Sequence, residues 1–143
     1  MAGYKKILVL LDLTDASEQI AAAGRDMAAH SNAAIVILHV VEFVPTEPMG
    51  ETLMPTVQIE ADLVDRARAR LGDLSTRMGL GSAGTRVEAG NKKTEILRVA
   101  KEEAVDLIVL GSRVRHGLGI LVNFTEDTVL HAAHCDVLAV RLG

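Results

Sequence analysis

The chain has 143 residues, close to the usual size of one domain, and a formal net charge of -4 at neutral pH. An acidic surface repels phosphate backbones and anionic lipids, and no segment approaches the ~20 apolar residues of a membrane span, so nucleic-acid and membrane partners are not expected. The lone cysteine, Cys135, cannot form an internal disulfide, which favours a reducing compartment. We therefore expect one domain over residues 1–143, located in the cytoplasm.

Short apolar runs rich in branched residues recur along the chain and predict strands. Because the longer runs are apolar throughout, helices should cover both of their faces. The predicted strands are 6–12, 34–41, 85–89, 106–111 and 137–140.

A first helix is predicted directly after the first strand. Thr14, Asp15 and Ser17 offer side-chain oxygens for its start. Apolar residues then recur at helical spacing until about 30–32, so this helix should present one apolar stripe to the sheet.

The second helix is predicted after an irregular connection. Residues 43–58 hold all three prolines of the chain, which argues against one long regular element there. Over 59–78 the apolar residues return to helical spacing, with Arg66 and Arg70 among the side chains turned towards water.

Two more helices complete the pattern. Asn91 is the predicted cap of a helix carrying Ile96, Val99 and Ala100, and a last helix should begin after Asn123. Alternating strands and helices predict an α/β fold with an open parallel sheet, helices on both faces and right-handed crossovers. In such sheets ligands bind beyond the carboxyl ends of the strands, where the strand order reverses.

Several segments of the chain, taken together, resemble those of the universal stress proteins. The segments are Tyr4–Asp12, Leu38–Val40, Gly90–Ile96, Asp106–Ser112, Val129–His131 and Cys135–Arg141. The resemblance implies a five-stranded sheet in the order 3-2-1-4-5, of the adenine nucleotide alpha hydrolase-like type. It also implies homodimers joined through the last strand, Val137–Arg141.

Many universal stress proteins bind ATP, and the resemblance carries a candidate site with it. An aspartate ending the first strand and backbone ending the second would lie near the adenosine, and a glycine-rich stretch after the fourth strand would surround the phosphates. The candidate cofactor-binding residues are Asp12, Val40, Val41, Gly111, Ser112, Arg113, Arg115 and Thr125.

The glycine-rich stretch departs from the family pattern at two positions. Val114 and Phe124 stand where glycines let backbone approach phosphate, and their side chains would fill that space. Arg113, Arg115 and Thr125 supply charge and a hydroxyl that can replace backbone donors. Weak or absent ATP binding is the favoured interpretation, and a nucleotide-dependent switch is the alternative.

Three further patterns have two interpretations each. Asp12 either contacts a nucleotide or caps the turn that follows it. His131, His134 and Cys135 are close in sequence, but their spacing at a helix end and the lack of a fourth ligand argue against a metal site. Arg113, Arg115 and His116 are either a solvated loop cluster or part of an anion site.

No arrangement for catalysis is visible in the sequence. The chain lacks a nucleophile with an oriented base, and Glu18, Glu60 and Glu102 lie on separate predicted helices, so they form no acid and base pair. We therefore expect a dimeric stress-response protein that acts by association with a protein partner and is not an enzyme.

Overall fold

The computed structural model describes residues 3–42, 56–113, 129 and 131–142, with backbone alone at 56–58 and 113. Strands and helices alternate as the sequence predicts. The elements are β1 (Lys6–Leu10), α1 (Ser17–Ser31), β2 (Ala34–Val41), α2 (Thr56–Arg77), β3 (Gly84–Ala89), α3 (Lys92–Glu102), β4 (Leu107–Arg113) and β5 (Asp136–Leu142).

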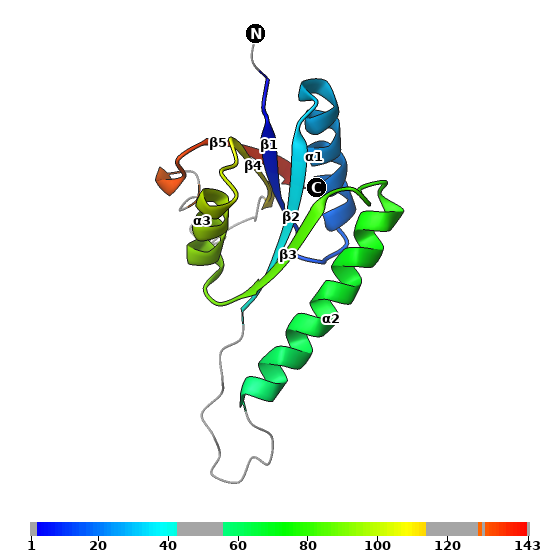
Figure 1. Ribbon diagram of the computed structural model, residues 1–143, viewed down its shortest axis with the longest axis vertical. Helices are drawn as coiled ribbons and strands as arrows, with labels where there is room; N and C mark the ends of the chain where they lie inside the picture. The colour runs from blue at the N-terminus through cyan, green and yellow to red at the C-terminus, as the bar shows by residue number, and fades with distance from the viewer. Residues whose placement is uncertain (1–2, 43–55, 114–128, 130, 143) are drawn as a thin grey trace.

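All neighbouring strands of the described sheet are parallel. The five strands lie in the order β3-β2-β1-β4-β5, which confirms the predicted fold class and strand order (Figure 1). Helices α1 and α2 cover one face of the sheet and α3 lies on the other. Among the helices that the structure describes, none combines the length and apolar character needed to cross a membrane.

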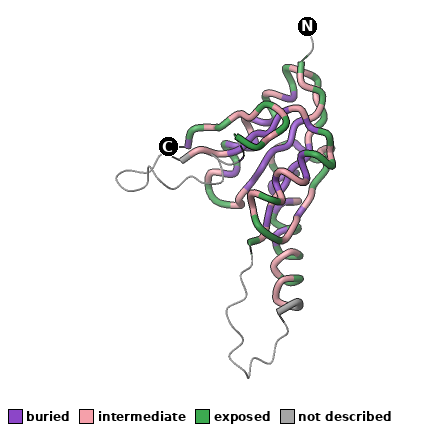
Figure 2. Tube along the Cα trace, turned by 90° about the vertical axis from the view of Figure 1, so that its left-hand side faces the viewer, coloured by how far each residue is buried: buried purple, intermediate pink, exposed green. Residues whose placement is uncertain are grey.

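The core has two layers because alternate residues of a strand face opposite sides of a sheet. In β1, Ile7 and Val9 pack towards α1 and α2, whereas Leu8 and Leu10 pack towards α3. All four are buried, and buried residues follow the strands through the middle of the molecule (Figure 2). This two-sided burial is why the strands read as continuous apolar runs.

The start of α1 differs from the prediction. Its N-cap is Ala16, whose side chain makes no capping hydrogen bond. The hydroxyls of Thr14 and Ser17 instead donate to Asp12, so they stabilise the turn before the helix and do not cap it. The predicted cap was therefore wrong, because these hydroxyls have a carboxylate within reach.

Other element ends also differ from the prediction. Strand β1 ends at Leu10, two residues before the predicted end at Asp12. Helix α2 begins at Thr56, so the last residues of the connection predicted to be irregular are helical, while 43–55 lie outside the described residues. Strands β4 and β5 are longer than predicted because they pair with each other as far as Arg113 and Leu142. The predicted last helix lies outside the described residues except for 129, 131 and 132, which are helical.

Candidate functional site

The carboxyl edge of the sheet opens between its two central strands. The pairing of β1 with β4 ends at Val9 and Val109, whereas β4 stays paired with β5 up to Arg113 and Leu142. Strand order also reverses here, since β2 lies on one side of β1 and β4 on the other. This is the position at which ligands bind in open α/β sheets.

Asp12 stands at this opening, two residues after the end of β1, and its carboxylate holds the next turn. Its Oδ1 accepts hydrogen bonds from the Thr14 N–H at 3.2 Å, the Thr14 hydroxyl at 2.7 Å and the Ser17 hydroxyl at 3.2 Å. Partial burial acts to raise the pKa of Asp12, but these hydrogen bonds and the charge of Lys92 outweigh it and lower the pKa. Asp12 is therefore an anion at neutral pH. It caps the turn that follows it, which was one of its two expected roles.

His39 lies half-buried near the end of β2, facing the α1 and α2 side of the sheet. Its Nδ1 is 2.7 Å from the Leu11 carbonyl oxygen, and since a carbonyl only accepts, Nδ1 carries the hydrogen. Burial lowers the pKa of His39, and the charges of Lys92 and Arg70 add to this, while the bond to Leu11 opposes it. The imidazole is therefore mainly neutral at pH 7.

Arg70 of α2 reaches the same turn. Its guanidinium Nη2 donates to the Leu13 carbonyl oxygen at 2.6 Å. Arg70 was predicted to face water, and its side chain is exposed, but this hydrogen bond was not predicted. The sequence offered one hint that His39 has a special role, because a histidine interrupts the apolar run of the strand predicted over 34–41.

The structure places part of the predicted nucleotide site at this edge. Val40 is buried on the α3 side and Val41 is half-buried on the α2 side, at the end of β2. Gly111 and Ser112 lie in β4. The candidates whose side chains fall outside the described residues are Arg113, Arg115 and Thr125, together with Val114 and Phe124.

A cavity of about 380 Å³ lies between the β1–α1 turn and α2. It is lined by Leu13, Thr14, Asp15, Ser17, Glu18, Arg70, Leu74 and Arg77. Arg77 pairs with Glu18 at 3.2 Å, and the two arginines of the lining face two carboxylates, so its charge is balanced. The cavity therefore has no net charge that would attract an anion.

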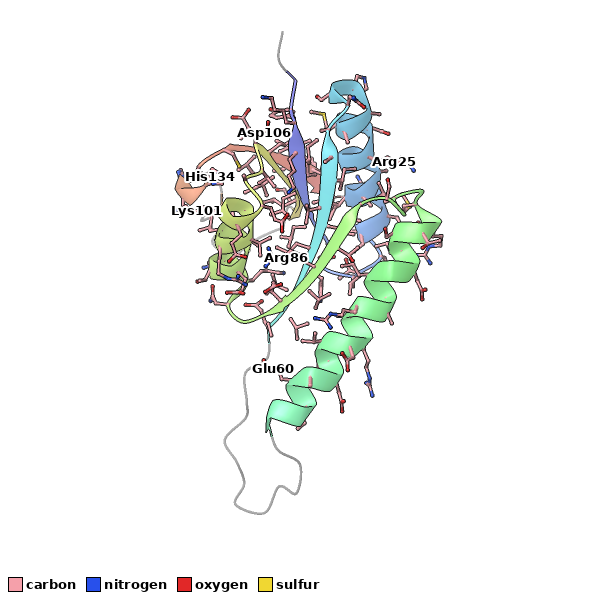
Figure 3. All side chains as sticks on the ribbon, viewed as in Figure 1. Arg25, Glu60, Arg86, Lys101, Asp106 and His134 are labelled. Carbon is pink, nitrogen blue, oxygen red and sulfur yellow. The ribbon has the colours of Figure 1, made fainter. Side chains whose placement is uncertain are left out.

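The residues weighed as metal ligands lie where the chain enters β5. His134 lies just before β5 (Figure 3). His131 and His134 are exposed, and Cys135 is half-buried. Within the described ranges, no group of three histidine, cysteine or acidic side chains lies close enough to hold a metal. Burial, helped by Asp136 and Asp106, raises the pKa of Cys135, which keeps it a thiol and not the thiolate that metals bind.

Fold and site together define a doubly wound α/β protein whose candidate ligand position is an aspartate at the opening between its central strands. A model of the universal stress protein family matches residues 3–141. The chain belongs to the universal stress protein family.

Curated relatives match along almost their whole length. The chain is 35% identical to "Universal stress protein A homolog 2" of Coxiella burnetii over 143 residues, which are 99% of this chain and 98% of the relative. It is 33% identical to "Universal stress protein A homolog 1" of the same organism, with 96% of each chain covered.

Solved structures agree with the fold. Universal stress protein UspA from Lactobacillus plantarum superposes with a TM-score of 0.74 at 26% identity, covering 99% of this chain and 100% of that one. A universal stress protein in complex with cAMP superposes with a TM-score of 0.73 at 22% identity, covering 96% and 97%. At that identity the likeness to the cAMP complex shows the fold alone.

Proposed function

We propose that this universal stress protein is a cytoplasmic homodimer that acts by associating with a protein partner and not by catalysis, with weak or absent ATP binding. The observation that carries the proposal is the open edge of the sheet at β5. The remodelled phosphate loop of the sequence, with Val114 and Phe124 in glycine positions, supports the weakness of nucleotide binding.

Strand β5 has the features of a self-pairing edge. It lies last in the sheet and, in the part of the chain that the structure describes, pairs with β4 alone. Ala139 is exposed, and Val137, Leu138 and Val140 are half-buried, so the strand carries apolar side chains beside an open edge. Such an edge is a template for pairing with a second chain, and a twofold dimer across Val137–Arg141 would cover it.

The opposite edge of the sheet is built differently. Strand β3 places Arg86 and Glu88 on its α3 side, where both are ion-paired. Charged side chains on an edge strand oppose edge-to-edge pairing. The contrast between the two edge strands supports the formation of a dimer through β5 and not of larger assemblies.

Native mass spectrometry of the freshly purified protein tests both parts of the proposal. We expect a dimer without bound nucleotide. Ala139→Glu would place like charges on both copies of the pairing strand, so we expect it to give monomers. Ala69→Glu makes the same change on the exposed side of α2 and should stay dimeric. A dimeric Ala139→Glu variant, or stoichiometric copurified ATP, would contradict the proposal.

A nucleotide-dependent switch is the second candidate, and Asp12 is the observation that favours it. Its ionised carboxylate stands at the opening where ligands of this fold bind, and the structural neighbour named above is a complex with cAMP. Thermal unfolding with millimolar Mg-ATP or cAMP tests this candidate, with Asp12→Asn as the control because the amide oxygen keeps an acceptor for the turn. A midpoint shift in the wild type that Asp12→Asn abolishes supports the switch, and no shift counts against it.

A further inference from the structure

The two carbonyls on either side of Asp12 are both held by side chains from other elements. His39 of β2 bonds the Leu11 carbonyl at 2.7 Å, and Arg70 of α2 bonds the Leu13 carbonyl at 2.6 Å. The Leu11 carbonyl belongs to the peptide that joins Leu11 to Asp12, and the Leu13 carbonyl belongs to the peptide that joins Leu13 to Thr14. The turn that carries the Asp12 carboxylate is therefore held by side chains of two elements.

The His39 side chain continues the hydrogen bonding between β1 and β2 at the point where the backbone hydrogen bonds end. The Leu11 N–H donates to the Leu38 carbonyl at 2.9 Å. In a parallel ladder the following bond would run from the Val40 N–H to the Leu11 carbonyl. The His39 side chain bonds that carbonyl oxygen from within β2, at the point where the chain leaves the sheet towards α1.

Arg70 holds a backbone conformation that side chains rarely adopt. Leu13 has a φ of 60°, in the left-handed region, which costs a residue with a Cβ about 1 kcal/mol or more. Such a conformation persists where its surroundings fix it. The Arg70 guanidinium bonds the carbonyl of this residue, and the side chain crosses from α2 to do so.

We infer that His39 and Arg70 are positioning residues for the Asp12 carboxylate, fixing the turn so that this acceptor is preorganised for a hydrogen-bond donor of a ligand. The inference rests on the second candidate function, since it takes Asp12 to be a ligand contact. It adds two residues, His39 of β2 and Arg70 of α2, which act through Asp12 and need not contact the ligand. A preorganised acceptor does not lose ordering entropy when the ligand arrives.

Amide hydrogen exchange and the titration of Asp12 test the inference without any ligand. The Thr14 amide is the reporter, because it donates to Asp12 Oδ1. In Arg70→Ala we expect this amide to exchange about two- to tenfold faster, the range expected for weakening one hydrogen bond, with strand β1 amides unchanged. Arg77→Ala is the matched control, since it removes an arginine of the same helix that pairs with Glu18 and not with the turn.

His39 variants separate the hydrogen bond from the bulk of the ring. Asn carries a donor at the position of Nδ1, whereas Gln carries it one bond further along, at the position of Nε2. We expect His39→Asn to keep the lowered pKa of Asp12, measured by carboxyl carbon NMR. The pKa should rise towards its ordinary value in His39→Gln and His39→Ala. Because the imidazole is mainly neutral, these changes alter no charge near Asp12 above pH 7.

The outcomes decide the inference for each residue separately. If a folded Arg70→Ala protein exchanges the Thr14 amide at the wild-type rate, Arg70 does not position Asp12. If Asp12 titrates alike in the Asn, Gln and Ala variants, His39 does not. Failure of nucleotide binding would appear as an absent thermal shift, and failure of dimerisation as a monomer mass, so neither is confused with these readouts.

Discussion

Gly111 of β4 lies directly against Ile20 of α1. A Cβ placed on Gly111 would come within 2.8 Å of Ile20 Cδ1 and 2.7 Å of Leu142 Cδ1, closer than real Cβ contacts. The family resemblance assigns this glycine to the phosphate loop, yet helix α1 and the end of β5 also need it for packing. Packing therefore favours a glycine here whether or not a nucleotide binds.

Gly111→Ala should lower the free energy of unfolding by about 1–3 kcal/mol, the usual cost of overpacking a core. Urea unfolding followed by circular dichroism measures the loss. In an Ile20→Ala background the contact with Ile20 is gone and only the contact with Leu142 remains, so we expect the same substitution to cost less there. Equal losses in the two backgrounds would show that the contact with Ile20 is not the cause.

Gly24 and Gly72 are helical glycines with opposite surroundings. A Cβ at Gly24 of α1 would lie 2.5 Å from Val9 Cγ2, whereas nothing lies within 4 Å of a Cβ at Gly72 of α2. Gly24→Ala should therefore destabilise the protein, by about 1–3 kcal/mol. Gly72→Ala should stabilise it by about 0.5–1 kcal/mol through helix propensity. Thermal midpoints that move in the same direction would contradict this contrast.

Features set by local pattern were predictable from the sequence. The strands follow from apolar runs, and Asn91 caps α3 as predicted, with its Oδ1 accepting the Thr94 N–H at 3.1 Å. A cap signal lies within three residues of the helix that it starts, so one sequence contains it. The strand order, in contrast, came from the family resemblance, because apolar periodicity does not say which strands are neighbours.

The contacts around Asp12 could not be predicted because they join distant parts of the chain. His39 and Leu11 are 28 residues apart, and Arg70 and Leu13 are 57 apart. A side chain that bonds a distant carbonyl leaves no periodic pattern, and an exposed arginine on a helix looks the same with or without such a bond. Asp12 itself was identified through the family resemblance, as the aspartate that ends the first predicted strand.

Arg86 joins β3 to the end of α3 through three carboxylates. Figure 3 labels Arg86 on β3. Its guanidinium lies 3.3 Å from Glu88 and 3.0 Å from both Glu102 and Glu103. Arg86→Ala removes one of the two cations near each of these carboxylates, since Glu88 and Glu102 keep Arg98 and Glu103 keeps Lys6, so it should cost about 1 kcal/mol in chemical unfolding. Arg77→Ala, which breaks one exposed pair, should cost less than about 0.5 kcal/mol. Salt near 1 M should shrink the difference, and an unchanged difference would argue against electrostatics.

The carboxylates around Arg86 should make the free energy of unfolding depend on pH in the acidic range. A hydrogen bond from Lys6, with a further one from Arg86, lowers the pKa of Glu103, and hydrogen bonds from Arg98 and Arg86 lower that of Glu102. A carboxyl whose pKa is lower in the folded state stabilises the fold fully above its unfolded pKa. This contribution is lost as the pH falls through the folded value. Below about pH 5 the wild type should lose stability more steeply than Arg86→Ala, and parallel pH profiles would contradict this.

Asp106 fastens the start of β4 to the start of β1. Its carboxylate accepts the Lys5 N–H at 2.9 Å and the Lys6 N–H at 3.1 Å, and these bonds lower the pKa of Asp106 against the effect of burial. Asp106→Ala should lower the free energy of unfolding by about 1–2 kcal/mol, since it leaves both amides without this acceptor.

Asp26→Ala is the control for the Asp106 substitution. Asp26 lies exposed on α1 and has a 3.8 Å contact with Arg25, so its loss should have little effect. The cost of Asp106→Ala should also vanish in acid, because the wild-type carboxyl is then protonated and accepts these bonds more weakly. If Asp106→Ala and Asp26→Ala unfold at the same denaturant concentration at neutral pH, the carboxylate is not what joins the two central strands at this end of the sheet.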